Sequence, residues 1–134
     1  MPGRDASLWL AEAGRANRLC ADVAAMLWDG ADERVVYRHG LQALAVADVA
    51  VANLKLLLGR GGLEDQRQQI QSWVSVLGYQ SEYLTRHLSA LVAQPRERLA
   101  LDVRAATRGD QEQRDDPSSA LYTRLVERRF AARG

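Results

Sequence analysis

The longest apolar-rich stretch of the chain, residues 35–58, constrains the fold more than any other feature. Its sequence is VVYRHGLQALAVADVAVANLKLLL. When it is wound at about 100° per residue, its apolar side chains fill a broad arc and leave a narrow polar stripe that carries Asp48 and Lys55. An arc this wide predicts a helix that is surrounded by neighbouring helices around most of its circumference. We therefore expect the rest of the chain to supply those neighbours.

The same stretch approaches the length of a membrane span, which needs about 20 apolar residues. It is interrupted by Gln42, Asp48, Asn53 and Lys55, and charged side chains at bilayer depth are costly. The first ten residues, MPGRDASLWL, lack the apolar core of a secretion signal. We therefore expect no membrane contact and a cytoplasmic location.

Apolar side chains recur at three- and four-residue steps in four further segments, which predicts helices over about 5–29, 63–93, 96–108 and 117–132. In the third of the five predicted helices an apolar residue returns every seven positions, which predicts a spine that packs lengthwise on another helix. The members of this spine are Leu63, Ile70, Leu77, Leu84 and Leu91. We see no convincing strand pattern in the sequence.

The breaks between these segments are short and contain glycine or proline. Gly30 is placed to end the first helix, Asp32 to cap the second, and Gly109 to stop the fourth. Residues 110–119, DQEQRDDPSS, contain no large apolar side chain, so we expect an exposed loop there. Together these patterns predict one domain over residues 1–134. It is an all-α, mostly antiparallel bundle of four to five helices with the apolar second helix at its centre.

Composition excludes several broad classes of protein. The chain has 134 residues, of which 47% are hydrophobic and 26% charged, and its net charge is +1. These values are typical of a globular domain and argue against overall disorder or a strongly basic nucleic-acid binder. Lys55 is the single lysine among 18 basic residues. Such an arginine bias is typical of a GC-rich genome, and we expect a bacterial source.

Few side chains are available for metal binding or nucleophilic catalysis. His39, His87 and Cys20 are the only histidines and cysteine, and neither histidine has the Glu-x-x-His spacing of a di-iron bundle. Cys20 lies on an apolar helix face, where a thiol is usually inert. We therefore predict no metal and no cofactor.

One short motif suggests an enzyme. The segment from Arg34 to His39 reads RVVYRH and resembles the Arg-x4–6-His motif of HEPN-type ribonucleases, which are small all-helical domains. In that family the arginine and histidine of two subunits face each other across an RNA phosphodiester. The resemblance implies metal-independent RNA cleavage, with His39 as the acid–base group and Arg34 as the phosphate clamp.

Nucleic-acid binding without catalysis is the broader alternative. Seven arginines near the C-terminus are candidates for contacts with phosphate. They are Arg96, Arg104, Arg108, Arg124, Arg128, Arg129 and Arg133. A purely structural explanation also exists, because arginines often occupy a solvated helix face and suit the C-terminal end of a helix dipole.

Aromatic residues suggest a third class, protein–protein interaction. Trp9, Trp28, Tyr79 and Tyr83 exceed what short helices readily bury, and exposed aromatics are frequent anchors of interfaces. They could instead pack inside the bundle. An adaptor or immunity-type protein that binds a single protein partner is therefore a further possibility.

We favour a non-catalytic subunit that assembles with itself or with other proteins and contacts RNA or DNA backbone through its arginines. In size and plan the chain is similar to the small all-helical subunits of multi-subunit CRISPR effector complexes. That similarity implies a position along bound nucleic acid.

Overall fold

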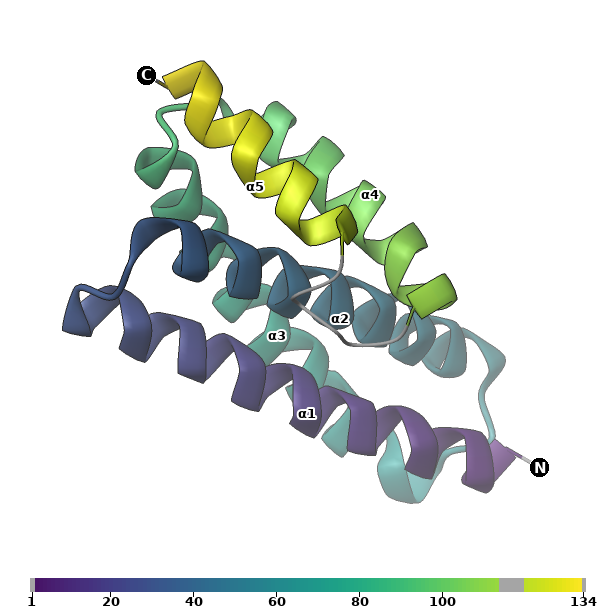
Figure 1. Cartoon of the computed structure of the whole chain (residues 1–134). Coiled ribbons are helices and arrows are strands. Elements are labelled where there is room, and N and C mark those ends of the chain that lie inside the picture. The colour runs from purple at the N-terminus through teal and green to yellow at the C-terminus, as the bar shows by residue number, and fades with distance from the viewer. Residues whose placement is uncertain (1, 114–119, 134) are drawn as a thin grey trace.

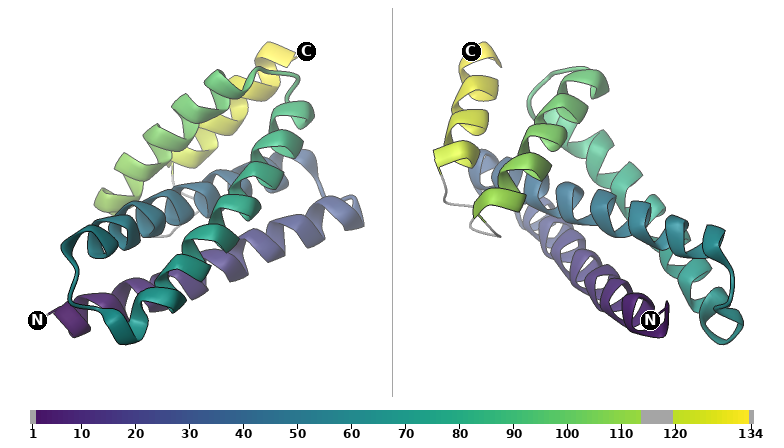
Figure 2. Two further views of the ribbon diagram at one scale, coloured as in Figure 1. Left: turned by 180° about the vertical axis from the view of Figure 1, so that it is seen from behind. Right: turned by 90° about the vertical axis from the view of Figure 1, so that its right-hand side faces the viewer.

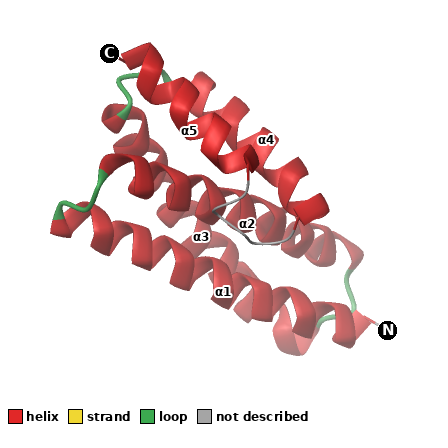
Figure 3. Ribbon diagram, in the orientation of Figure 1, coloured by secondary structure: helices red, strands yellow, loops and turns green. Residues whose placement is uncertain are grey.

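The computed structural model describes residues 2–113 and 120–133, with side chains described for 5–108 and 120–132. These residues form five helices and no strand, which confirms the predicted all-α bundle (Figures 1 and 3). The helices are α1 (Pro2–Asp29), α2 (Glu33–Arg60), α3 (Glu64–Leu91), α4 (Arg96–Gln113) and α5 (Ala120–Arg133).

Helix α2 is the centre of the molecule. It contacts all four other helices, with α1 on one side, α4 and α5 on the opposite side, and α3 behind it in the view of Figure 1. The predicted cap is confirmed, because the Asp32 carboxylate accepts hydrogen bonds from the backbone N–H groups of Arg34 (3.0 Å) and Val35 (3.2 Å). Alanines on α2, such as Ala43, Ala47 and Ala50, are fully buried and let the neighbouring helices approach closely.

Helices α1 and α2 pack side by side along their length and α3 crosses both obliquely, whereas α4 and α5 form a separate layer above α2 (Figure 2). The predicted spine of α3 is inside the bundle: Ile70, Leu77 and Leu84 are fully buried, and Leu63 is nearly so. Leu91, at the last turn of α3, is only partly buried. The link between α2 and α3 uses Gly61 and Gly62 at positive φ angles (76° and 74°), a backbone region that glycine adopts without strain.

Two of the predicted boundaries were wrong. Helix α1 begins at Pro2 rather than Asp5, because the fixed φ of proline suits the first helical turn. Helix α4 continues through Gly109 to Gln113, because a glycine inside a helix costs only about 1 kcal/mol. Residues 110–113 are therefore helical, while the rest of the predicted loop and the predicted start of the last helix at 117–119 lie outside the described residues.

Helix α2 is also long and apolar enough to pass a simple test for a membrane span, by length and composition. In the fold, 56% of its most apolar window is buried against the other helices. The core helix of a soluble protein passes the same test, so a single helix of this kind is weak evidence for a membrane span.

Two glycines test the close packing of α2 on α3. A Cβ added at Gly40 would lie 2.9 Å from Cδ2 of Leu88 and closer still to its Cδ1, and Leu88 is fully buried with little room to move. We expect Gly40→Ala to lower the free energy of unfolding by about 1–3 kcal/mol, the usual cost of overpacking.

Gly78 on α3 is the matched control, because a Cβ there meets nothing within 4 Å. Gly78→Ala should raise the free energy of unfolding by about 0.5–1 kcal/mol, since alanine is the better helix former. Urea denaturation of both variants measures the difference. Equal effects of the two substitutions would contradict the described packing at Gly40.

Candidate nucleic-acid interface

A buried ion pair fastens the α4–α5 layer to the central helix. Arg129 on α5 donates to both carboxylate oxygens of Asp102 on α4, from Nε to Oδ2 (2.6 Å) and from Nη2 to Oδ1 (2.8 Å). The hydroxyl of Tyr37 on α2 donates to the same Oδ2 (2.8 Å). Asp102 is 1% exposed, Arg129 5% and Tyr37 fully buried. This Tyr37–Asp102–Arg129 network therefore joins three helices through one carboxylate.

The network raises the pKa values of Tyr37 and Arg129. Burial, together with the negative charge of Asp102, raises the pKa of Tyr37 far above its ordinary value, so its hydroxyl remains a donor well into the alkaline range. The hydrogen bonds to Asp102 raise the pKa of the Arg129 guanidinium. The positive charge is thus held firmly on Arg129, inside the protein.

A second contact holds α5 against the start of α2. The Arg34 guanidinium lies over the ring of Phe130 (5.0 Å from its carbon to the ring centroid) and its Nε is 3.5 Å from Oε1 of Glu127. Phe130 also meets the Tyr37 ring edge to face, with centroids 6.1 Å apart. Arg34 thereby pairs with the one acidic residue in the described part of α5.

These contacts engage two of the three carboxylates among the described side chains of α4 and α5. The described side chains of α4 and α5 include seven arginines and three carboxylates. Asp102 is bound by Arg129, and Glu127 by Arg34, which leaves Glu97 as the one free acid among these side chains. Five arginines are exposed and have no acidic partner among the described residues: Arg98, Arg104, Arg108, Arg124 and Arg128. We call these five the arginine layer.

The seven predicted arginines are thus placed in different ways. Arg104, Arg108, Arg124 and Arg128 belong to the arginine layer. Arg96 is exposed, but it forms a two-pronged pair with Glu82 of α3 (2.7 and 3.2 Å). The side chain of Arg133 lies outside the described residues.

Arg129 differs most from its predicted role, because it is buried and fully engaged with Asp102. It is structural in this fold and presents no free face to a phosphate. A signal for this was in the sequence: Arg129 is seven residues after Tyr122, so both lie on the apolar face of α5. Arg98, which was not among the predicted arginines, is exposed like the other members of the arginine layer.

The aromatic candidates divide into two pairs. Trp9 and Tyr83 are half-buried against the core, and the Tyr83 ring lies on that of His87 with centroids 4.3 Å apart. Trp28 is 90% exposed and Tyr79 76% exposed. Trp28 and Tyr79 are therefore the two aromatic residues that remain candidates for a protein interface.

The fold does not bring Arg34 and His39 together within one chain. Five residues apart on a helix, they point about 140° away from each other, and Arg34 is engaged with α5. Burial, followed by the positive charge of Arg38, lowers the pKa of His39, so its imidazole is neutral near pH 7. The ribonuclease alternative stays a prediction that requires a second subunit to complete the pair.

The remaining chemical candidates are buried or dispersed. Cys20 is fully buried, and burial, with a contribution from the charge of Asp48, raises the pKa of its thiol to about 11. A thiol in that state is a poor nucleophile at neutral pH. Among the described residues, no group of three or more His, Cys, Asp or Glu lies close enough to hold a metal ion.

Comparison of the chain with protein-family models, with curated proteins and with solved structures finds no match. The functional conclusions below therefore rest on the residues and geometry of this chain alone.

The buried pair gives a sharp test of how the arginine layer is held in place. Asp102→Asn removes the charge and leaves the Arg129 guanidinium buried without a counterion, which typically costs about 3–5 kcal/mol. The double variant Asp102→Leu with Arg129→Met should recover most of this loss, because it removes both charges and keeps apolar volume. Thermal and urea unfolding measure all three proteins.

Glu82→Gln provides the control, since it breaks the exposed Arg96–Glu82 pair and exposed pairs contribute little. Its effect on stability should be clearly smaller than that of Asp102→Asn. If Asp102→Asn proved no more destabilising than Glu82→Gln, the network would not be what fastens the layer.

Proposed function

We propose that this protein is a non-catalytic subunit of a cytoplasmic multi-protein assembly and that its arginine layer contacts the backbone of RNA or DNA. The observation that carries the proposal is the sorting of charge on α4 and α5. Among the described side chains of these helices, two of the three carboxylates are engaged in ion pairs, and five arginines stay exposed with no acidic partner among the described residues. Guanidinium groups in this state favour phosphate, which accepts their paired donors.

Local charge is a better guide here than net charge. The whole chain is nearly neutral at +1, which argues against non-specific attraction of nucleic acid by the entire surface. The arginine layer is confined to two adjacent helices on one side of α2 (Figure 1). Such a localised surface supports a role in which other subunits supply part of the affinity and this one adds backbone contacts.

The protein-contact surface that we propose lies on α1 and α3. Gln80 of α3 donates to Asn17 of α1 (Nε2 to Oδ1, 3.1 Å), which marks the seam between these helices. Trp28 follows Asn17 by eleven residues and so lies on the same side of α1, whereas Tyr79 points about 100° away from Gln80 around α3. Both aromatic side chains are largely exposed, as expected of anchors that a protein partner buries.

The arginine layer is tested with the triple variant Arg108→Gln, Arg124→Gln and Arg128→Gln. We expect weaker binding of single-stranded RNA, and a slope of log affinity against log salt that is smaller by about 2, since each neutralised phosphate contributes about 0.7. Fluorescence anisotropy over a range of salt concentrations measures both quantities.

The control removes the same charge from the other three helices: Arg18→Gln, Lys55→Gln and Arg67→Gln, all at exposed positions. This variant should retain the wild-type slope. Equal losses in the two triple variants would show that net charge rather than the layer is responsible, and an unchanged affinity in both would refute the nucleic-acid part of the proposal.

The protein-contact surface is tested with Trp28→Ser combined with Tyr79→Ser. A tagged wild-type chain, purified at low salt from cells that naturally produce it, should retain a stoichiometric protein partner or a second copy of itself. The double variant should lose that partner at least tenfold by quantitative mass spectrometry.

Leu101→Ser is the matched control, because Leu101 is 52% exposed on α4, away from the α1–α3 seam. It should leave the complex intact. Retention of the partner by the double variant would overturn the assignment of this surface. Loss of the partner from the Leu101→Ser variant as well would show that any added surface polarity disrupts the complex.

A further inference from the structure

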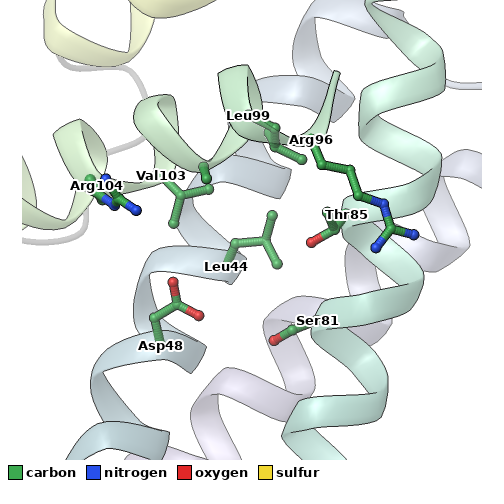
Figure 4. Close-up of a pocket in the computed structure, with 9 residues that line it drawn as sticks. Leu44, Asp48, Ser81, Thr85, Arg96, Leu99, Val103 and Arg104 are labelled. Atoms are coloured by element: carbon green, nitrogen blue, oxygen red, sulfur yellow. The ribbon is translucent and has the colours of Figure 1, made fainter. Parts of the chain in front are cut away.

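A cleft between α2, α3 and α4 has the features of a small-molecule site, and Arg104 is its one residue from the arginine layer. Its volume is about 210 Å³, below the roughly 300–1,000 Å³ typical of sites for drug-sized ligands. It can therefore take a molecule of amino-acid size but not a nucleotide. Figure 4 shows side chains from the three helices around this space.

Asp48 of α2 supplies the negative charge of the cleft. Its side chain is exposed to the opening, yet the surrounding protein removes enough water that burial raises the pKa of the carboxyl group. In the described part of the chain this carboxylate makes no hydrogen bond or ion pair within the usual distances. A partly desolvated carboxylate in this state favours a cation or strong donor beside it.

The positive charge of the cleft comes from α4. Arg104 lines the same space, is exposed and forms no ion pair with Asp48 or another described acid. Arg96 also lines the cleft, but its guanidinium is bound by Glu82. One free carboxylate and one free guanidinium therefore border the cleft from different helices without neutralising each other.

The rest of the lining is divided between hydroxyl and apolar groups. Ser81 and Thr85 lie one turn apart on α3 and can donate or accept hydrogen bonds. Leu44 and Leu99 supply an apolar wall from α2 and α4 (Figure 4). A ligand that matches this lining has both charges, some hydrogen-bonding capacity and an aliphatic part.

We propose that the cleft binds a free α-amino acid with an aliphatic side chain. Its ammonium group lies on Asp48 and within reach of the Ser81 and Thr85 hydroxyls, its carboxylate lies on Arg104, and its side chain packs on Leu44 and Leu99. A simple anion of this size is repelled by Asp48, and a simple amine by Arg104. The dipolar molecule alone satisfies both charges. The inference shares only Arg104 with the nucleic-acid proposal.

Three probes of nearly the same shape test this inference: L-leucine, 4-methylpentanoate, which lacks the ammonium group, and 3-methylbutylamine, which lacks the carboxylate. Each is titrated into the full-length ¹⁵N-labelled protein without nucleic acid. L-Leucine should give saturable shifts in amide signals of residues 44–48, 81–85 and 99–104. Each analogue should bind at least tenfold more weakly.

Two variants locate the contacts. Asp48→Asn and Arg104→Gln should each weaken L-leucine binding at least tenfold, while Arg98→Gln, an exposed arginine of α4 outside the cleft, should not. Asp48→Asn should also raise the melting temperature of the ligand-free protein, because it removes a desolvated charge. That result shows the variant is folded and separates loss of binding from loss of structure.

The outcomes discriminate among ligand classes. Equal binding of the amine and L-leucine would overturn the inference in favour of a cation site, and equal binding of 4-methylpentanoate would overturn it in favour of an anion site. Shifts that do not saturate, or that persist in both cleft variants, would show that the cleft takes no amino acid.

Discussion

The structure depends on one carboxylate placed where three helices meet. Asp102 accepts from Arg129 and from Tyr37, and without it the layer formed by α4 and α5 would be held to α2 by apolar contacts and the Arg34 contacts alone. A buried pair of this kind adds little net stability over well-packed apolar residues, since desolvation offsets its attraction. Its contribution is specificity: only one rotation of α5 presents Arg129 to Asp102.

This fixed rotation has a direct effect on the surface. With Arg129 turned inward, Arg124 and Arg128 face away from the apolar side of α5, and Glu127 is directed to Arg34. The buried Asp102–Arg129 pair thus determines which charged side chains of α5 face the solvent. The aromatic anchors on α1 and α3 belong to a different part of the bundle, so the proposed protein and nucleic-acid contacts do not compete for the same side chains.

The fold was largely predictable from the sequence because its main signals are periodic. The apolar arc of residues 35–58 and the seven-residue spine from Leu63 specified a central helix and a partner along it, and both were confirmed. The prediction that Gly109 ends α4 was wrong, because the free-energy cost of one glycine in a helix is smaller than the stabilisation that tertiary packing provides. The role of Arg129 was missed because its partner is 27 residues away, and periodicity reports which face a residue occupies but not what it meets there. The cleft was missed for the same reason, since its charges come from separate helices.

The division into two layers implies that the molecule does not open all at once. Helices α1, α2 and α3 share extensive mutual contacts, whereas α4 and α5 touch chiefly α2, and α4 touches α3 more than it touches α5. Cooperative units of native structure tend to follow such boundaries. When the Asp102 network breaks, α5 loses its ion pair with α4, whereas α4 keeps its contacts with α3. Amide protons of α5 should therefore exchange with solvent through a local opening of lower free energy than the opening that exposes α2. Part of the arginine layer then lies on the least stable helix of the protein.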